Sequence, residues 1–205
     1  MLDVDGTLLD SLPIKNKVFI DVLRSEGIPI KFSTPIIQNT IALTRSDRFK
    51  KIWKEFHNEE ISMAILDKLL LKSTEKLSNC FFPPINGAND FINQMAQSYQ
   101  FHIITAAEES EVVRNFNKLG WSKLLTSATF KVSQKNLVFK NLIAQHSISV
   151  EQYLAIGDTE SDCLAALENK VDFWIISKST NLTTPVAQFS SGISMDFYPV
   201  IQYLS

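Results

Sequence analysis

Cysteine is scarce in this chain, since only Cys80 and Cys163 occur among its 205 residues. Two cysteines are too few for a disulfide framework, and nothing in their surroundings suggests a metal centre. No apolar run approaches the ~18 residues that a membrane-spanning helix needs. The first residues include aspartates where a secretion signal would have cations and an apolar block. We therefore expect a cytoplasmic protein with no membrane partner.

A dominant charge is also missing. The net charge of −2 and the pI near 5.9 give no general attraction to nucleic acid. The three histidines lie far apart without ligand spacing, and internal repeats and low-complexity tracts are absent from the sequence. What is present, 45% hydrophobic and 20% charged residues, suits one core plus a modest insertion.

The most informative stretch runs from Asp3 to Asp10 and reads Asp-Val-Asp-Gly-Thr-Leu-Leu-Asp. In an extended segment, residues i and i+2 point the same way, so Asp3 and Asp5 would face one pocket. Two carboxylates held that close are costly unless a cation lies between them or one carries a proton. Gly6 lets the backbone turn away, and the Thr7 hydroxyl can hold the turn. An Asp-Gly pair alone is most often only a turn, but together these residues predict a site.

Strand and helix signals alternate along most of the chain. This alternation predicts an α/β fold, a Rossmann-like parallel sheet with helices on both faces. Ligands of such sheets lie at the carboxyl ends of the strands, where we expect Asp3, Thr105 and Asp158. The expected strands are 2–4, 101–105, 124–130, 153–157 and 173–177, and the expected helices are 88–97, 108–119, 136–145 and 161–169.

Between Ser11 and Phe82 the pattern changes to helix only, with apolar residues at three- and four-residue spacing. Pro83, Pro84 and Gly87 indicate the return to the sheet domain. We therefore predict a core domain of residues 1–11 and 82–205 and a small all-α domain of residues 12–81.

The segment Asp3–Ser11 resembles the signature of the haloacid dehalogenase-like superfamily. Three further elements resemble the family's later motifs: Thr105 after an apolar strand, the Gly157–Asp162 stretch, and a lysine at a variable position. Lys135 precedes Asp158 by 23 residues and Lys131 precedes it by 27, so Lys135 is preferred and Lys131 is the reserve. Separately, each element has an ordinary structural explanation, but four in the right order favour the family.

The resemblance implies a phosphatase with an α-helical cap inserted after the first motif. Asp3 would be the nucleophile and Asp5 the general acid and base. Mg²⁺ would be bound by Asp3, Asp158 and the backbone carbonyl of Asp5, with Asp162 supporting this shell. The groups expected to bind the phosphoryl oxygens are Thr105, Lys135 and the backbone N–H groups near Gly6 and Ala106.

The expected activity is therefore hydrolysis of a small phosphorylated metabolite through an aspartyl-phosphate. Family members that cleave carbon–halogen bonds lack an aspartate at the position of Asp5, so a dehalogenase is disfavoured. A phosphomutase of the β-phosphoglucomutase kind and a non-catalytic phosphate-binding module remain alternatives. The sequence identifies neither the substrate nor whether the protein is a monomer or a dimer.

Charge divides unevenly between the two predicted domains. Residues 12–81 carry a net charge of +4 and the remainder −6, which suggests that Arg45 and Arg48 help hold an anionic substrate; a solvated basic face is the alternative.

The first expected strand is unusually short. Only Met1 and Leu2 precede Asp3, although a central parallel strand is usually a longer apolar run. A chain extended upstream of Met1 is therefore expected to be more thermostable.

Overall fold

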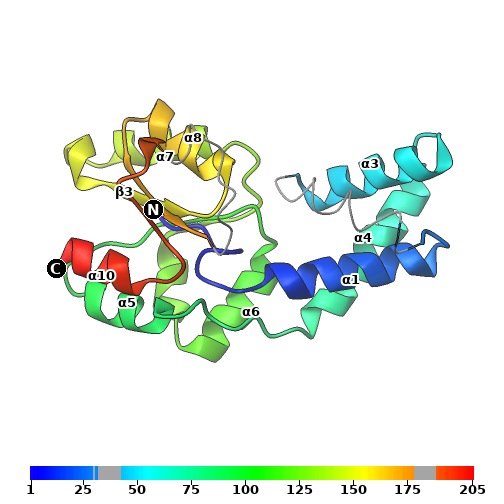
Figure 1. Cartoon of the computed structure of the whole chain (residues 1–205), viewed down its shortest axis with the longest axis horizontal. Coiled ribbons are helices and arrows are strands. Elements are labelled where there is room, and N and C mark those ends of the chain that lie inside the picture. Colours follow the sequence, from blue (N-terminus) through cyan, green and yellow to red (C-terminus); the bar gives the residue numbers. More distant parts are fainter. Residues whose placement is uncertain (30, 32–42, 178–187) are drawn as a thin grey trace. The chain divides into compact units, whose positions relative to one another are not determined.

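The computed structural model describes residues 1–29, 31, 43–177 and 188–205. These residues form two compact units (Figure 1). One unit combines Met1–Ser11 with Phe82–Ser205, and the other is Leu12–Phe81. Each unit has its own buried residues, so each is described by itself.

The first unit is built on a parallel sheet. Its strands pair in parallel as β1 with β2 and as β3 with β4 and β5. Leu2 forms parallel bridges to both Ile103 and Ile156, so the amino-terminal segment lies between β1 and β3. The described order is thus β2, β1, the amino-terminal segment, β3, β4 and β5, which confirms the predicted sheet. The strands are β1 (Ile103–Ile104), β2 (Ala128–Thr129), β3 (Leu154–Gly157), β4 (Asp172–Ile176) and β5 (Gly192–Ser194).

Helices cover both faces of this sheet, with α7 and α8 on one side and α5, α6 and α10 on the other (Figure 1). Phe139, Cys163 and Phe173 belong to one buried cluster that joins α7 and α8 to the strands. On the other side Phe91 and Phe197 pack with ring centroids 4.7 Å apart. The helices are α5 (Ala88–Met95), α6 (Glu109–Leu119), α7 (Lys135–Gln145), α8 (Glu160–Glu168) and α10 (Tyr198–Leu204).

One predicted strand is largely wrong. Most of the expected strand 124–130 is the 3-10 helix η1 (Ser122–Ser127), and only the two residues of β2 are extended. The Leu124 N–H donates to the Trp121 carbonyl. Hydrogen bonds between residues three apart therefore replace the extended conformation that the β-propensity of this apolar run predicts. A second 3-10 helix, η2 (Val150–Gln152), precedes β3.

The described residues of the second unit form helices and the turns between them, with no strand. Ser and Thr side chains cap two of its helices: Thr44 accepts from the Asp47 N–H, and Ser62 accepts from the Ile65 N–H. Its core includes Phe19 stacked on Phe49, with ring centroids 4.1 Å apart. The helices are α1 (Leu12–Ser25), α3 (Arg45–His57) and α4 (Met63–Ser78).

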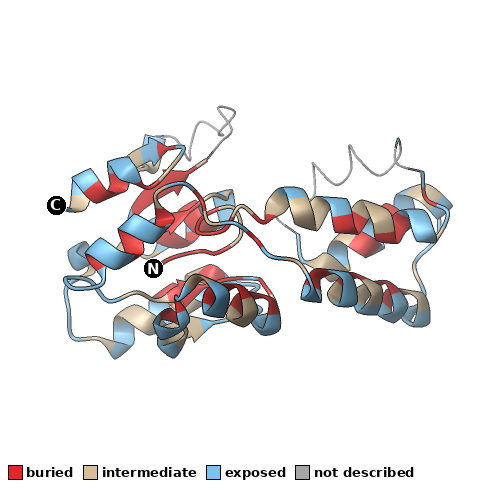
Figure 2. Ribbon diagram, turned by 90° about the horizontal axis from the view of Figure 1, so that it is seen from below, coloured by how far each residue is buried: buried red, intermediate tan, exposed pale blue. Residues whose placement is uncertain are grey.

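Burial follows the predicted pattern in each unit (Figure 2). Val18, Phe19, Val22 and Leu23 are the buried residues of α1, at the three- and four-residue spacing seen in the sequence. In the sheet unit, β4 has four buried residues in a row, as expected of a strand covered on both faces. In the described part of the chain, we find no helix with the length and hydropathy needed to cross a bilayer.

Candidate active site

Asp3 is positioned by the sheet itself. The Leu2 N–H donates to the His102 carbonyl (2.8 Å) and the Asp3 N–H donates to the Ile156 carbonyl (3.0 Å). These bonds fix the amino-terminal segment between two strands and place Asp3 at its carboxyl end. Asp3 is buried, with 6% of its surface exposed.

A tight turn follows immediately. The Gly6 N–H donates to the Leu9 carbonyl (2.8 Å), and the Leu9 N–H donates back to the Val4 carbonyl (2.9 Å). Gly6 has φ of 85°, a left-handed conformation that glycine adopts without a steric penalty. The Thr7 hydroxyl donates to Asp158 Oδ1 (3.2 Å). Thr7 therefore links the first motif to the motif after β3, in addition to its place in the turn.

The second acidic pair comes from the end of β3 and the start of α8. Thr159 caps α8: its hydroxyl oxygen accepts from the Asp162 N–H (3.3 Å), and the Asp162 carboxylate accepts from the Thr159 N–H (3.2 Å). The Thr159 hydroxyl also donates to Asp162 Oδ2 (2.5 Å). Thr159 was not among the predicted site residues, although a Thr three residues before an acidic residue is the signal of such a cap.

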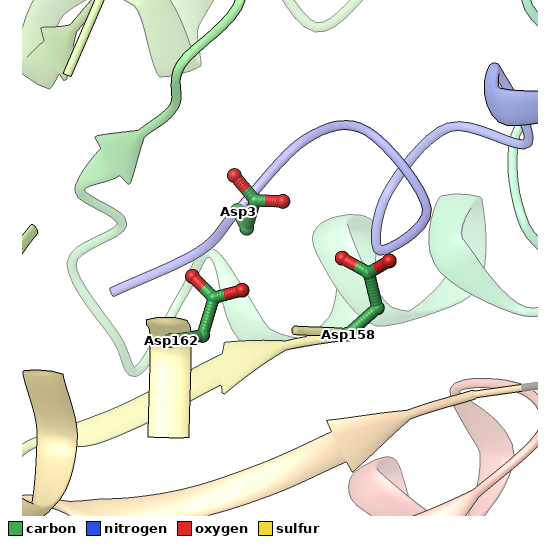
Figure 3. A group of neighbouring side chains, drawn as sticks. All are labelled: Asp3, Asp158 and Asp162. Atoms are coloured by element: carbon green, nitrogen blue, oxygen red, sulfur yellow. The ribbon is translucent and has the colours of Figure 1, made fainter. Parts of the chain in front are cut away.

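Three carboxylates converge at this edge of the sheet (Figure 3). One oxygen from each of Asp3, Asp158 and Asp162 lies within 4.8 Å of the other two. Burial, chiefly, raises the pKa of Asp3 to about 6, and burial together with the neighbouring carboxylates raises the pKa of Asp158 well above its usual value. An all-oxygen cluster of this kind fits a small hard divalent cation, which would relieve the repulsion.

Lys135, the first residue of α7, completes the cluster. Its Nζ donates to Asp3 Oδ1 (2.7 Å) and to Asp162 Oδ1 (2.5 Å), and the side chain is buried. Burial alone lowers the pKa of this ammonium, but the charges of Asp3 and Asp162 outweigh burial and raise it. Lys131 instead pairs with Glu108 (2.7 Å), and 64% of its side-chain surface is exposed. Of the two candidate lysines, the structure brings only Lys135 to the carboxylates.

Asp5 lies outside the group of three carboxylates. It is partly buried, and its Oδ1 accepts a hydrogen bond from the Ser11 hydroxyl (2.6 Å). Ser11 is fully buried, so this contact holds the Asp5 carboxylate in a defined orientation. Ser11 belongs to the predicted motif, but no role was predicted for it. The sequence feature that could have indicated this role is a hydroxyl side chain six residues after Asp5, at the end of the same motif.

Thr105 follows β1 at the same edge as Asp3, because Leu2 bridges Ile103 in a parallel register. Its side chain is buried, and its Oγ1 accepts from the Ala107 N–H (3.1 Å). The hydroxyl proton of Thr105 therefore stays available to another acceptor. Ala106 follows on the same loop. These groups and the Gly6 turn form the part of the edge predicted to bind phosphate.

Arg45 and Arg48 make contacts inside the helical unit. Arg45 Nη1 donates to Thr74 Oγ1 (3.2 Å), and Arg48 Nη2 donates to Asn16 Oδ1 (2.9 Å). The Arg48 guanidinium also lies 4.6 Å from the centroid of the Phe19 ring. Burial and the charge of Arg45 lower the pKa of Arg48 to about 10. These contacts give Arg48 a packing role, and its predicted contact with substrate stays a prediction.

Comparison with solved structures reveals the same fold in several proteins. A predicted phosphoglycolate phosphatase from Haemophilus somnus 129PT has a TM-score of 0.80 at 17% identity, covering 100% of this chain and 96% of that one. A predicted beta-phosphoglucomutase from Thermotoga maritima has a TM-score of 0.73 at 15% identity, with 100% and 98% covered. The predicted HAD-hydrolase YfnB from Bacillus subtilis, bound to magnesium, has a TM-score of 0.75 at 18% identity, with 99% and 96% covered. At these identities the likeness shows the fold alone.

Comparison by sequence gives the family. A search of the curated proteins returned no match. The family model of the haloacid dehalogenase-like hydrolases, however, matches residues 1–176, which include all four motif elements. The match covers most of the chain and agrees with the fold. The protein therefore belongs to the haloacid dehalogenase-like hydrolase family.

Proposed function

We propose that this hydrolase is a Mg²⁺-dependent phosphatase that cleaves a small phosphorylated metabolite through an aspartyl-phosphate on Asp3. The observation that carries the proposal is the contact of Asp3 with Lys135 inside a cluster of three carboxylates. A buried carboxylate with a cationic partner is suited to attack phosphorus, since the same cation can then bind the phosphoryl oxygens.

The reaction would proceed in two displacements. A carboxylate oxygen of Asp3 attacks phosphorus, and the bond from phosphorus to the ester oxygen breaks. Protonated Asp5 gives its proton to the departing oxygen, which leaves as an alcohol. Asp5, now a carboxylate, takes a proton from water, and this water attacks the phosphorus of phospho-Asp3. The bond between phosphorus and the Asp3 carboxylate oxygen breaks, inorganic phosphate leaves, and Asp3 and protonated Asp5 are restored.

Electrostatic stabilisation would come from groups at the carboxyl edge of the sheet. The Lys135 ammonium, the Thr105 hydroxyl and the N–H groups around Gly6 and Ala106 neutralise the transferring phosphoryl oxygens. Asp3, Asp158 and Asp162 would hold the Mg²⁺ ion, with the Asp5 backbone carbonyl as a further ligand. When bound, the ion would supply positive charge that offsets the carboxylates and polarises the phosphoryl group.

Phosphomutase activity is the second candidate, because the fold is also that of a predicted beta-phosphoglucomutase. A mutase would use the same Asp3 and Asp5 but return the phosphoryl group to a sugar instead of to water. A non-catalytic phosphate-binding module is less consistent with the site, since such a module has no use for Asp5 held by a buried hydroxyl.

The experiment is phosphate release with Mg²⁺ across phosphoglycolate, sugar phosphates, nucleotides and amino-acid phosphates. We expect turnover that disappears in Asp3→Asn and in Asp5→Asn, with acid-stable capture of phospho-Asp3 by mass spectrometry in the active protein. Asp172→Asn, at an exposed aspartate that begins β4, is the matched control and should retain turnover. Isomerisation that needs a bisphosphate primer would favour the mutase. Binding without turnover, or turnover that survives in Asp3→Asn, would contradict both proposals.

A further inference from the structure

Lys131 has a backbone conformation that lysine rarely adopts. In the described part of the chain, three residues other than glycine have a positive φ: Asn58 at 57°, Lys131 at 56° and Lys170 at 58°. Asn58 caps the end of α3 and Lys170 follows the cap of α8, and left-handed residues are common at helix ends. Lys131 instead follows the strand β2. Strained backbone of this kind is concentrated at functional sites, so Lys131 is a candidate for a functional role.

Lys131 is an extra residue in the pairing of two parallel strands. In a regular parallel ladder, a residue donates its N–H to one residue of the neighbouring strand and accepts from the residue two positions further on. The Thr105 N–H donates to the Thr129 carbonyl (3.0 Å), so the Thr105 carbonyl would be expected to accept from Lys131. It accepts instead from the Val132 N–H (3.0 Å). Lys131 therefore forms a bulge after β2, and bulges end regular pairing and bend the chain.

The bulge turns the Lys131 N–H toward the loop that follows β1. This N–H donates to the Ala107 carbonyl (3.2 Å). The Ala107 N–H donates to the Thr105 hydroxyl oxygen (3.1 Å), so hydrogen bonds hold Ala107 at both its N–H and its carbonyl. Ala106 lies between Thr105 and Ala107, and its N–H is one of the proposed phosphate donors. The bulge thus helps to set the shape of the loop from Thr105 to Ala107.

The same bulge helps to set where α7 begins. Val132, the next residue, belongs to the buried cluster that joins α7 to the strands. Its burial and its hydrogen bond to Thr105 hold the chain just before Lys135, the first residue of α7. From there, Lys135 Nζ reaches Asp3 Oδ1 at 2.7 Å. One short segment therefore positions two parts of the site, the loop after β1 and the Lys135 ammonium.

The side chain of Lys131 contributes little to this arrangement. Its ammonium pairs with Glu108 (2.7 Å), but 64% of the Lys131 side chain and 41% of the Glu108 side chain are exposed, so solvent screens the pair. The site instead depends on the left-handed backbone. Valine rarely adopts this conformation because its branched Cβ crowds the backbone, whereas glycine adopts it freely.

We infer that Lys131 is a positioning residue, whose left-handed bulge holds the Thr105–Ala107 loop and Lys135 in place to bind one phosphoryl group. The inference rests on the proposed function, which assigns these groups to the phosphoryl oxygens. A regular ladder would turn the Lys131 N–H back to the Thr105 carbonyl, and the Ala107 carbonyl would lose its bond. The loop and the start of α7 would then shift relative to one another.

The test compares Lys131→Val with Lys170→Val, its matched control. Both lysines are left-handed and each precedes a buried valine, but Lys170 connects α8 to β4. Each substitution should lower the Tm by about 2–6 °C. Only Lys131→Val should weaken the binding of inorganic phosphate in the presence of Mg²⁺, with a Kd about tenfold higher or more by isothermal titration calorimetry. Lys131→Gly should bind phosphate within about twofold of the unchanged protein, because glycine keeps the bulge.

Amide hydrogen exchange supplies a readout that does not depend on phosphate. The backbone amides at positions 131 and 132 donate to Ala107 and to Thr105. Their protection factors should be about tenfold lower or more in Lys131→Val than in Lys170→Val, because only the first substitution opens the bulge. In Lys131→Gly these amides should remain protected.

Equal Kd values for phosphate in Lys131→Val and Lys170→Val would overturn the inference, and so would unchanged protection at positions 131 and 132. An equal loss of affinity in Lys131→Gly and Lys131→Val would also overturn it, because the lost charge would then explain the effect. If the unchanged protein binds no phosphate, the proposed function fails. The protection factors still show whether the bulge holds the two loops together, so the two failures are distinguishable.

Discussion

Gly157 and Asp162 pack so closely that a Cβ atom on Gly157 would lie 2.5 Å from both Cβ and Cγ of Asp162. The contact explains why the last residue of β3 has no side chain. Asp162 fills the space beside the backbone, and from there its carboxylate reaches Lys135 and the Thr159 cap.

The first prediction follows from this contact. Gly157→Ala should displace the Asp162 carboxylate, so that Lys135 loses one of its two hydrogen-bond acceptors. We expect kcat to fall about 100-fold or more. The overpacking should also cost about 1–3 kcal/mol in the free energy of unfolding. Kinetics and urea denaturation measure the two effects.

Gly120→Ala is the matched control for this change. Gly120 has φ of 75°, and a methyl group added there would meet open space, so the substitution strains only the backbone at the end of α6. Stability should fall by about 1 kcal/mol while kcat is retained. Equal losses of kcat in both variants would mean that general destabilisation, and not the displaced carboxylate, explains the Gly157 effect.

The second prediction concerns the choice between the two lysines. Lys135→Met leaves Asp3 and Asp162 buried without their cationic partner, so we expect a loss of about 3 kcal/mol in the free energy of unfolding and a severe loss of kcat. Lys131→Met breaks only an exposed, solvent-screened pair with Glu108 and should leave the stability nearly unchanged. A larger kinetic defect in Lys131→Met would contradict the assignment of Lys135.

The third prediction is a pH-dependent stabilisation by Mg²⁺. Burial raises the pKa of Asp3 to about 6, above its unfolded value of 3.8. Between these values the metal-free folded state therefore binds more protons than the unfolded state, so its stability falls as the pH rises across this range and levels off above it. A cation bound to the ionised carboxylates offsets that loss, so the rise in Tm caused by Mg²⁺ should be small at pH 5 and larger at pH 7.5.

Thermal denaturation with Mg²⁺ and with a chelator, at both pH values, measures this effect. The Asp158→Asn variant removes one proposed ligand and should weaken the response at pH 7.5. A response to Mg²⁺ that is equal at the two pH values, or unchanged in Asp158→Asn, would show that the cation acts elsewhere.

The fourth prediction concerns His102, the residue that precedes β1. Burial first, then the Met1 amine and His146, lower the pKa of His102 from 6.5 to about 4. Between these values the unfolded state binds a proton that the folded state does not, so the free energy of unfolding falls as the pH falls. Because His102 is only partly buried, we expect its contribution to be about 1 kcal/mol between pH 7 and pH 4.5.

Urea denaturation of the unchanged protein and of His102→Gln across this pH range isolates the contribution. The loss of stability on acidification should be smaller in the variant, since glutamine does not titrate. An identical pH dependence in the two proteins would rule out the role of His102.

The fifth prediction tests whether the arginines of α3 recognise substrate. If Arg45 and Arg48 help hold the non-reacting part of an anionic substrate, Arg45→Ala and Arg48→Ala should raise KM for the true substrate about tenfold with little change in kcat. Lys50→Ala, at an exposed lysine of the same helix, is the control. An unchanged KM in both variants would leave the two arginines with their packing contacts alone.

The sequence by itself determined the class of the fold and the candidate residues of its site. Strand and helix patterns depend on side-chain periodicity, which is local, so helices such as α6 and α7 could be predicted to within a residue or two. The motif around Asp3 is also local, because its turn needs only Gly6 and neighbouring hydroxyls. The 3-10 helix η1 was missed because an apolar run does not distinguish a strand from a buried turn.

Only the tertiary structure decided how these residues meet. The choice of Lys135 over Lys131 depends on which lysine begins α7 beside Asp3, and spacing along the chain could only favour one of them. The roles of Ser11 and Thr7 as partners of Asp5 and Asp158 required contacts across the turn and across the sheet. The reason for glycine at position 157 is a contact with Asp162, and close packing of that kind is set by three-dimensional geometry instead of by sequence pattern.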